Sequence, residues 1–231
     1  FEDDEKNYKT LIYCASNNKC DEIIKFLLNK INYSNNTLSE YLDDFIRNNC
    51  SIDTIKICLE KGGRISQFVL ISYLKNLNFE IFKLLVEYGC IINDDILFWT
   101  MVNLSFDKTK YILSLGYKCE NINTLKKIYE INNSQQILKL LIEINDEFLY
   151  PLLEWACNEY KNDLIKFILL NKNIDINRNN GYLLTISVKK QNCKIVKFLL
   201  KMGADINNPR IFEIIKERKL YKIEKLLQSY I

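Results

Sequence analysis

The chain of 231 residues contains no histidine, only two prolines and six glycines, and no apolar run long enough to cross a membrane. Without histidine it has no Ser-His-Asp or Cys-His site, no HExxH metal site and no kinase catalytic loop. Its one glycine pair, Gly62-Gly63, is not part of a phosphate-binding motif. These absences predict a protein that is not an enzyme and that holds no metal and no cofactor.

The eight cysteines are scattered, without a CxxC pair or the spacing of a zinc site. We interpret them as small apolar fillers in a reducing compartment. No charged-then-apolar leader precedes the rest of the chain. We therefore expect an intracellular, cytoplasmic protein that does not bind membranes. The first residue is Phe1 rather than methionine, so we expect a fragment or a processed product.

The most regular feature is a lysine that recurs at nearly constant intervals, here called the ladder lysine. Apolar residues lie on both sides of it, as in Ile195-Val196-Lys197-Phe198-Leu199-Leu200. The ladder lysines are Lys25, Lys56, Lys83, Lys110, Lys139, Lys166, Lys197 and Lys225, at spacings of 31, 27, 27, 29, 27, 31 and 28 residues. Self-similarity at such a period indicates a repeat architecture.

Each period resolves into two helices. The apolar residues around the ladder lysine crowd one side of a helix. About ten residues upstream, a shorter apolar segment such as Tyr182–Val188 or Leu152–Cys157 predicts a first helix of two turns. Six residues after the lysine, four repeats have a glycine and one has Asn145, which suits the left-handed residue that ends a helix. These glycines are Gly62, Gly89, Gly116 and Gly203.

A pair of helices of this kind cannot bury its apolar side alone, so the pairs must stack. We predict that residues 1–231 form a single continuous array of about eight helix-turn-helix repeats. The repeats lie roughly at 8–34, 39–66, 67–93, 94–121, 122–148, 149–177, 180–207 and 209–231.

The segment Gly203-Ala204-Asp205-Ile206-Asn207 resembles the end of an ankyrin repeat, and residues 195–200 resemble its second helix. Tyr182-Leu183-Leu184-Thr185 stands where the family has Thr-Pro-Leu-His. Since histidine is absent, the hydroxyl–histidine bonding of that family must be missing or replaced. The period is also shorter than the usual 33 residues, which predicts short or absent β-hairpin fingers. The resemblance implies an all-α ankyrin-type solenoid that works as a non-catalytic protein–protein interaction module.

The abundance of Asn, Ile and Lys resembles the degenerate ankyrin arrays of giant DNA viruses and poxviruses. That resemblance implies a viral adaptor that acts on host proteins in the host cytoplasm. A structural or scaffold component of a virion or larger assembly is the alternative, and self-association would favour it. Binding of a polyanion by the basic C-terminal end is a third and less favoured reading, and we do not expect a nucleic acid partner.

In ankyrin proteins the two residues that end each first helix face the concave groove, and the resemblance carries this role to seven pairs of residues. The pairs are Asn17-Asn18, Asn48-Asn49, Lys75-Asn76, Val102-Asn103, Ile131-Asn132, Asn158-Glu159 and Lys189-Lys190. We expect the partner to contact Asn18, Asn48, Asn49, Asn76, Asn103, Asn132, Glu159, Lys189 and Lys190. Asparagine offers both donors and acceptors. Coding bias and the ending of helices explain the same row, so both readings stay open.

Charge is distributed unevenly along the chain. An acidic residue precedes five ladder lysines by three positions, which predicts a solvated, partly neutralised outer face. These residues are Glu22, Asp53, Glu80, Asp107 and Asp163. From Lys189 to Lys225 there are eleven basic residues and four acidic ones, about +7, whereas the whole chain is +3. This end either favours an acidic partner or is a soluble cap on the last repeat.

Two other features have a structural and a functional reading. Trp99 and Trp155 occupy equivalent places in a first helix, where we favour packing over a role as recognition anchors. The carboxylate pairs Asp43-Asp44 and Asp94-Asp95 are expected near the start of a first helix, where acids suit the helix dipole. We favour that role over catalysis.

Overall fold

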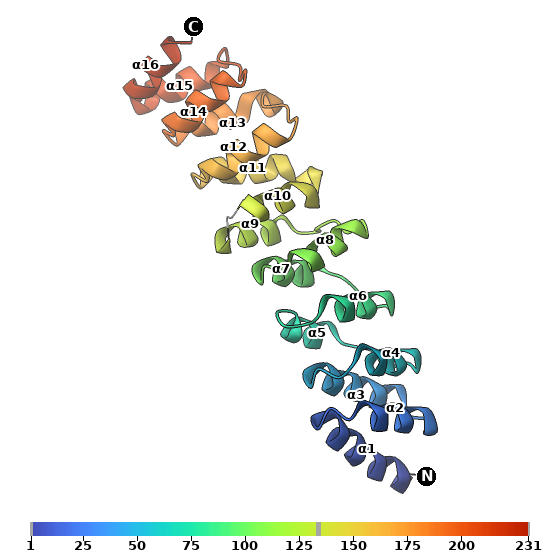
Figure 1. The fold of residues 1–231 in the computed structure, drawn as a ribbon. Helices are drawn as coiled ribbons and strands as arrows, with labels where there is room; N and C mark the ends of the chain where they lie inside the picture. Colours follow the sequence, from blue (N-terminus) through green and yellow to red (C-terminus); the bar gives the residue numbers. More distant parts are fainter. Residues whose placement is uncertain (1, 133–134, 231) are drawn as a thin grey trace. The chain divides into compact units, whose positions relative to one another are not determined.

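A computed structural model describes residues 2–132 and 135–230 of the chain (Figure 1). In these residues the chain is 71% helix with no strand, and its 16 helices pack in consecutive pairs. The predicted all-α solenoid of stacked helix pairs is therefore confirmed, as are the absent hairpin fingers within the described ranges. The helices form two compact units, Phe1–Cys119 and Glu120–Ile231. Continuity of the array across both units stays a prediction.

The first unit contains four helix pairs. Its helices are α1 (Glu2–Asn17), α2 (Asp21–Lys30), α3 (Asn35–Arg47), α4 (Ile52–Glu60), α5 (Gln67–Tyr73), α6 (Phe79–Glu87), α7 (Asp94–Val102) and α8 (Phe106–Ser114). The odd-numbered helices are the first helices of the pairs and contact one another in succession, and the even-numbered second helices do the same. The unit thus has a layer of first helices and a layer of second helices.

The second unit repeats this arrangement. Its helices are α9 (Ile122–Ile131), α10 (Gln135–Ile144), the short 3-10 helix η1 (Asp146–Phe148), α11 (Leu149–Asn158), α12 (Asn162–Asn171), α13 (Arg178–Lys189), α14 (Cys193–Lys201), α15 (Pro209–Arg218) and α16 (Tyr221–Gln228). The first helices α9, α11, α13 and α15 form one layer, and α10, α12, α14 and α16 form the other.

The apolar residues that flank each ladder lysine form the core, as the periodicity predicts. In α14, Ile195, Val196 and Leu199 are fully buried, whereas Lys197 between them is exposed. A helix with this spacing buries one stripe and leaves the opposite face in water. The core of each unit therefore lies between the two helix layers.

Half of the 16 α-helices in the described residues start at a Ser or Asn whose side chain accepts a hydrogen bond from a backbone N–H of the first turn. The serines are Ser34, Ser51 and Ser66, and the asparagines are Asn78, Asn93, Asn121, Asn192 and Asn208. A cap of this kind satisfies an N–H that has no partner within the helix. Part of the asparagine content of the chain thus serves helix capping.

The second helices end as predicted at four glycines in the left-handed region, with φ between 79° at Gly116 and 109° at Gly62. The prediction for Asn145 is wrong. Its φ is −160°, because its side chain instead caps η1 by accepting the Glu147 N–H at 3.0 Å.

Six first helices end at a left-handed residue that is not glycine. These residues are Lys19, Asn49, Leu104, Tyr160, Gln191 and Lys219, with φ between 53° and 57°. A residue with a Cβ atom is disfavoured in this region. The tight turn between the two helices of a pair therefore carries local strain that the stacking of the repeats must outweigh.

Most of the first helices are longer than the two turns expected, although α5 has only seven residues. α1 has 16 residues, α3 has 13 and α13 has 12, whereas the second helices have eight to ten. In α3 the extra length comes from the Ser34 cap, which starts the helix at Asn35, before the predicted repeat boundary at 39. In α13 the first turn is distorted, because Asn179, Asn180 and Gly181 all have left-handed dihedral angles.

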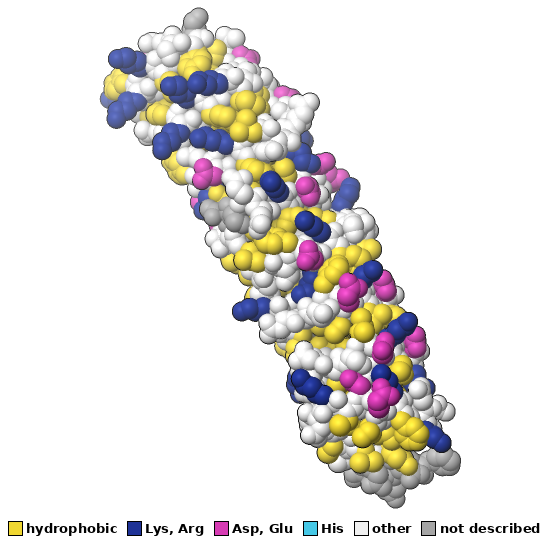
Figure 2. Space-filling model, in the orientation of Figure 1, with side chains coloured by type: hydrophobic (Ala, Val, Ile, Leu, Met, Phe, Trp, Pro, Cys, Tyr) yellow, Lys and Arg dark blue, Asp and Glu magenta, His cyan; other side chains and the backbone are white. Residues whose placement is uncertain are grey.

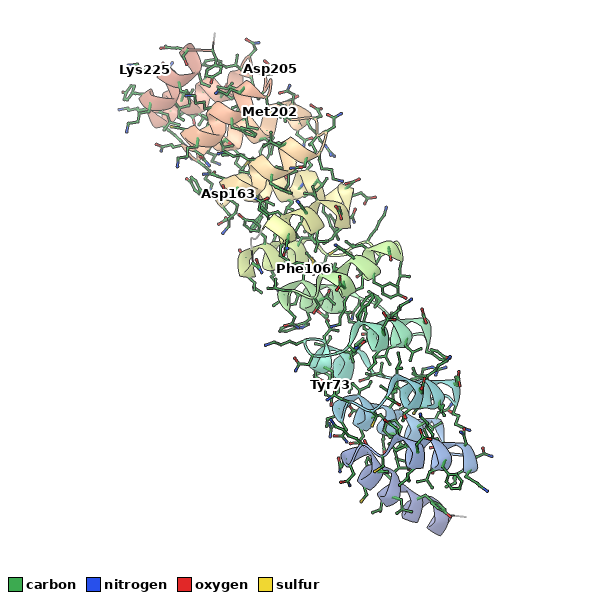
Figure 3. The ribbon with its side chains drawn as sticks, in the orientation of Figure 1. Tyr73, Phe106, Asp163, Met202, Asp205 and Lys225 are labelled. Carbon is green, nitrogen blue, oxygen red and sulfur yellow. The ribbon has the colours of Figure 1, made fainter. Side chains whose placement is uncertain are left out.

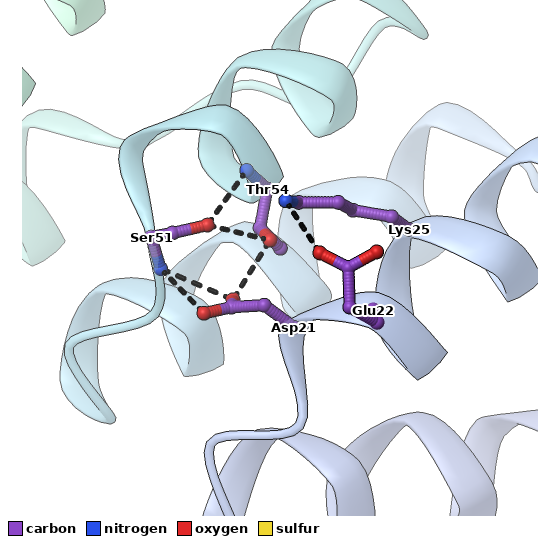
Figure 4. A network of polar contacts seen from close by, with 5 residues as sticks. All are labelled: Asp21, Glu22, Lys25, Ser51 and Thr54. Carbon is purple, nitrogen blue, oxygen red and sulfur yellow. Dashed lines mark hydrogen bonds and ion pairs between the residues drawn. The ribbon is translucent and has the colours of Figure 1, made fainter.

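Polar contacts join successive repeats at the starts of the second helices (Figure 4). Asp21, at the start of α2, accepts hydrogen bonds from the Ser51 N–H at 3.1 Å and from the Thr54 hydroxyl at 2.8 Å. The carboxylate thus binds the first turn of α4, where the helix dipole favours negative charge. Asn162 and Asn192 form the same link between α12 and α14, with a distance of 2.7 Å between their amide groups.

The last helix pair presents charge where other pairs present an apolar surface. Glu224, directly before Lys225 (Figure 3), is exposed. The residue before every other ladder lysine is buried, namely Ile24, Ile55, Phe82, Thr109, Leu138, Ile165 and Val196. Lys216 is likewise exposed in α15, whereas Val188 at the same place in α13 is buried. The surface of α15 and α16 at these two positions is therefore polar.

Candidate functional site

A pocket of about 550 Å³ lies on the first-helix layer of the second unit, and we call it the basic pocket. It is lined by Asn158 of α11, by Tyr182, Thr185, Ile186, Lys189 and Lys190 of α13 and the turn after it, and by Arg210, Ile214, Glu217 and Arg218 of α15. Three successive repeats build it. The stacking period therefore brings together residues that are about sixty positions apart in the sequence.

The floor of the basic pocket is formed by Thr185, Ile186 and Ile214, which are all less than a tenth exposed. The Thr185 hydroxyl donates to the Gly181 carbonyl at 3.2 Å and accepts from the Asn208 amide at 3.4 Å. Thr185 stands at the histidine position of the ankyrin opening motif. A threonine–asparagine contact here takes the place of the hydroxyl–histidine bonding.

The rim of the basic pocket carries Lys189, Lys190, Arg210 and Arg218 against the single carboxylate Glu217, so its net charge is +4 − 1 = +3. Within the described part of the chain, none of these five groups has an ion-pair partner within 4.0 Å. The positive charge therefore faces water. Figure 2 shows the wider setting, in which Lys and Arg side chains gather over the C-terminal helices with few carboxylates among them.

Lys190 is held in place by the neighbouring repeat. The Tyr160 hydroxyl donates to the Lys190 backbone carbonyl at 2.6 Å, and the Lys190 ammonium lies 5.9 Å from the centre of the Tyr160 ring. A cation over an aromatic face is weakly attracted to it. The contact orders the turn after α13 at the edge of the pocket.

Some of the predicted partner-binding residues of the second unit line the basic pocket, and others lie outside it. Lys189 and Lys190 line the basic pocket, and Glu159 is exposed in the turn next to Asn158. Asn132 is half-buried after α9 and does not line this pocket. The sequence interpretation did not single out Arg210 and Arg218 as binding residues, although the excess of positive charge from Lys189 to Lys225 was their signal.

The first unit has a smaller pocket of about 230 Å³, between the ends of two first helices and the start of α6. It is lined by Ile46, Arg47, Asn49, Tyr73, Asn76, Leu77, Asn78 and Ile81. It therefore brings together the predicted residues Asn49 and Asn76. Its one cationic group is already paired, because Arg47 lies 3.2 Å from Asp43 and donates to the hydroxyl of Tyr73 (Figure 3) at 3.0 Å.

Asn48 connects repeats within the unit. Its amide nitrogen lies 2.9 Å from the Ser16 hydroxyl, 2.9 Å from the Asn17 side-chain oxygen and 3.3 Å from Asp44. Since one NH₂ group has only two hydrogens, these acceptors occupy it fully.

The other predicted partner-binding residues of the first unit lie in different surroundings. Asn18 bonds the Cys14 carbonyl at 2.7 Å, and Asn103 is half-buried after α7. The asparagines of the predicted row thus occupy several different environments.

The expected pairing of ladder lysines with acids three residues earlier holds for Lys25 and Glu22, at 3.1 Å. Lys56 and Lys83 instead approach acids four residues later, Glu60 and Glu87, each at 4.0 Å. Both spacings place the two side chains on one helix face. All of these pairs are at the surface, where such contacts contribute little to stability.

Two further expectations need correction. Trp99 is 40% exposed rather than packed in the core, and its ring meets the adjacent Phe98 ring edge-on with 5.2 Å between the ring centres. Asp43 and Asp44 lie in the last turn of α3 and not near its start, since the Ser34 cap begins the helix earlier. Asp94 and Asp95 do lie in the first turn of α7, as predicted.

The other tryptophan is half-buried. Trp155 contacts the Tyr129 ring edge-on at 6.0 Å, and the ammonium groups of Lys126 and Lys161 lie 5.9 and 5.8 Å from its ring centre. Such a ring joins neighbouring first helices through aromatic and cation–π contacts.

Several cysteines are apolar fillers, as expected. Cys58 is fully buried, and burial raises the pKa of its thiol to about 12. Burial also raises the pKa of the Cys157 thiol to about 11. Since the thiolate is the reactive form, these two groups are unreactive at neutral pH. Cys14 and Cys193 are exposed, contrary to that expectation.

Comparisons with known proteins agree with this geometry. In the part of the chain that the structure describes, no helix is long and apolar enough to span a membrane. No curated protein and no solved structure matches the chain. The family model described as ankyrin repeats (3 copies) matches residues 127–210, which include most of the basic pocket. Residues 127–210 therefore carry ankyrin repeats, and the fold of the chain is an ankyrin-type helical solenoid.

Proposed function

We propose that this chain is a protein-binding module that holds its partner on the first-helix layer of the second unit. Ankyrin repeats generally mediate protein–protein interactions. The observation that carries the proposal is the basic pocket, which three successive repeats build from residues with unpaired charges. A surface spread over several repeats suits a polypeptide partner.

The composition resembles that of viral ankyrin arrays, and this resemblance implies a more specific form of the proposal. The chain would then be an adaptor that acts on host proteins inside a cell and has no enzymatic activity of its own. Cys58 and Cys157 are buried and form no disulfide, which fits a reducing compartment where cysteines serve packing.

The proposal is tested by hydrogen exchange on the complex with a partner captured from host-cell cytosol. We expect protection of α11, α13 and α15 on binding, with little change in α12, α14 and α16. The capture is repeated with Lys189→Glu/Arg218→Glu and with a matched control, Lys194→Glu/Lys222→Glu, on the second helices. Protection confined to the second helices, or equal loss of the partner in both variants, would show that the first-helix layer is not the binding surface.

A scaffold role through self-association is a second candidate, because the first helix pair exposes an apolar face. Leu11, Ile23 and Phe26 are 52%, 52% and 60% exposed. Ile23 lies two residues before its ladder lysine, and Leu11 lies eight residues before the left-handed Lys19. In the five later repeats that also have a left-handed residue at this turn, the residue at the place of Leu11 is fully buried, namely Tyr41, Ile96, Leu152, Leu183 and Ile211.

In later repeats these positions face the preceding repeat. Thr54, at the position of Ile23, donates to Asp21, and the ring of Tyr41, at the position of Leu11, lies 5.7 Å from Tyr13. Association of two copies through this face would bury it. Sedimentation velocity over a range of concentrations should then show a dimer that Ile23→Glu abolishes. Phe68→Glu, at a residue 82% exposed elsewhere, is the control. A monomer at every concentration would remove this candidate.

A further inference from the structure

We infer that the partner segment held in the basic pocket is acidic and inserts an apolar side chain between carboxylates. This inference rests on the proposed function and specifies the chemistry that the pocket recognises. The carboxylates would pair with the four cations of the rim, and the apolar side chain would lie on the isoleucine floor.

The charge of the rim selects for an acidic partner. Lys189, Lys190, Arg210 and Arg218 converge on one pocket, and Glu217 is the only carboxylate that lines it. Like charges held near one another raise the electrostatic free energy of the unbound protein. An incoming carboxylate relieves this repulsion and gains a charge-assisted hydrogen bond, which is bidentate where it meets an arginine. A basic or neutral segment obtains neither gain.

The floor of the pocket selects for an apolar side chain. Ile186 is 4% exposed and Ile214 is 9% exposed, and the Thr185 hydroxyl between them in the lining is already bonded within the fold. A polar group placed on this floor loses its water without finding a new partner. An aliphatic side chain loses nothing and buries further apolar area.

A nucleic acid fits the pocket less well. Proteins that hold single strands combine positive charge with several aromatic faces on which successive bases stack. The basic pocket offers one exposed ring, Tyr182, and its apolar floor gives a sugar–phosphate chain nothing to bind. A polypeptide with carboxylates on both sides of a leucine or isoleucine uses the rim and the floor together.

The first unit explains why the inference applies to one pocket only. In the smaller pocket the guanidinium of Arg47 is paired with Asp43 and bonded to Tyr73, and the remaining polar lining consists of neutral amides. Its charge is therefore balanced before any partner arrives. Both pockets include residues from the ends of first helices, and their difference in charge predicts a difference in ligand.

The test is fluorescence anisotropy with the full chain and a labelled peptide in which one leucine is flanked by glutamates on both sides. We expect binding that weakens about tenfold in Lys189→Glu/Arg218→Glu and strengthens two- to fivefold in Glu217→Gln. The control Lys194→Glu/Lys222→Glu carries the same change in net charge and should bind as the native chain does. Circular dichroism checks that all variants are folded.

Three competing ligands identify the chemistry that the pocket recognises. The peptide with its leucine changed to serine should bind at least fivefold more weakly, because the floor is then unfilled. A lysine-flanked peptide should not compete. Single-stranded DNA that competes better than the acidic peptide would overturn the inference in favour of a polyanion site. If both double variants lose equal affinity for the acidic peptide, the binding is nonspecific charge attraction and the inference is wrong.

Failure of this inference is distinguishable from failure of the proposed function. If the acidic peptide does not bind but a captured protein protects α11, α13 and α15 from exchange, the module binds proteins and the acidic chemistry is wrong. If no protein protects these helices, the proposed function itself fails.

Discussion

The left-handed turn residues allow a stability prediction with an internal control. Gln191 lies in the turn between α13 and α14 with φ 57°, and its side chain is exposed. Asn76 lies in the corresponding turn between α5 and α6, is also exposed, and is not in the left-handed region. Substitution by glycine at the two positions removes a polar side chain from the same kind of turn, but relieves strain at only one.

The expected magnitudes follow from two opposing effects. A residue with a Cβ atom in the left-handed conformation costs about 1–2 kcal/mol. Glycine costs about 0.5–1 kcal/mol through its greater freedom in the unfolded chain. Gln191→Gly should therefore raise the free energy of unfolding by about 0.5–1 kcal/mol, whereas Asn76→Gly should lower it by a similar amount.

Urea denaturation followed by far-ultraviolet circular dichroism measures both effects. Because the two turns lie in different units, hydrogen exchange of α14 and of α6 assigns each change to its own unit. If Gln191→Gly destabilises its unit as much as Asn76→Gly does, the turn of α13 is not strained, and the account of the first-helix ends is wrong.

Three further perturbations test other parts of the fold. Asp21→Ala should destabilise the first unit by about 1.5–3 kcal/mol in urea denaturation, because the start of α4 loses a charged acceptor. Between pH 9 and 12, the free energy of unfolding of Cys58→Ala should fall less steeply than that of the native chain. Burial raises the folded-state pKa of this thiol to about 12, so its stabilising effect is complete below the ordinary thiol pKa of 9.0 and is lost as the pH rises toward 12. That loss has a slope of about 1.4 kcal/mol per pH unit. Asn48→Ala should lower the free energy of unfolding by about 1–2 kcal/mol, and Asn103→Ala by less than about 0.5 kcal/mol.

Each of these measurements has a contrary outcome. Asp53, exposed in the first turn of α4, is the control for Asp21, and an equal effect of Asp53→Ala would show that the link between the repeats is not responsible. An unchanged alkaline slope in Cys58→Ala would place the titration elsewhere. Equal effects at Asn48 and Asn103 would contradict the bridging role of Asn48.

The sequence predicted the features that depend on a residue and its close neighbours. The spacing of the ladder lysines predicted an array of about eight helix pairs, and the 16 helices of the described residues do pack in consecutive pairs. The glycines after these lysines marked the ends of four second helices. Each of these signals acts within one turn of the chain, where local sterics and periodicity decide the structure.

The sequence could not predict what the stacking decides. Asn48 bridges to Ser16 and Asn17 because the fold places these residues opposite it, although they are some thirty positions away. Arg210 and Arg218 join Lys189 at one pocket for the same reason. Composition shows how much positive charge is present, but the register between repeats determines which charges meet.

The same dependence on the register between repeats explains why the left-handed residues of the turns could not be predicted. A lysine, leucine, tyrosine or glutamine gives no local signal for a left-handed conformation. Neighbouring helices that pack on both sides of the turn impose it, at Leu104 as at Gln191. A search for glycine therefore finds the ends of second helices and misses those of the first.

The charged surface of α15 and α16 has a consequence for the size of any assembly. Lys216 and Glu224 would lose their water if another copy stacked on this side, so the cost of desolvating them opposes growth in that direction. The apolar side of α1 and α2 has no such barrier. Copies that meet there would bury matching faces about a twofold axis. Association through the first helix pair would then stop at the dimer, because a closed twofold contact leaves no copy of that face exposed.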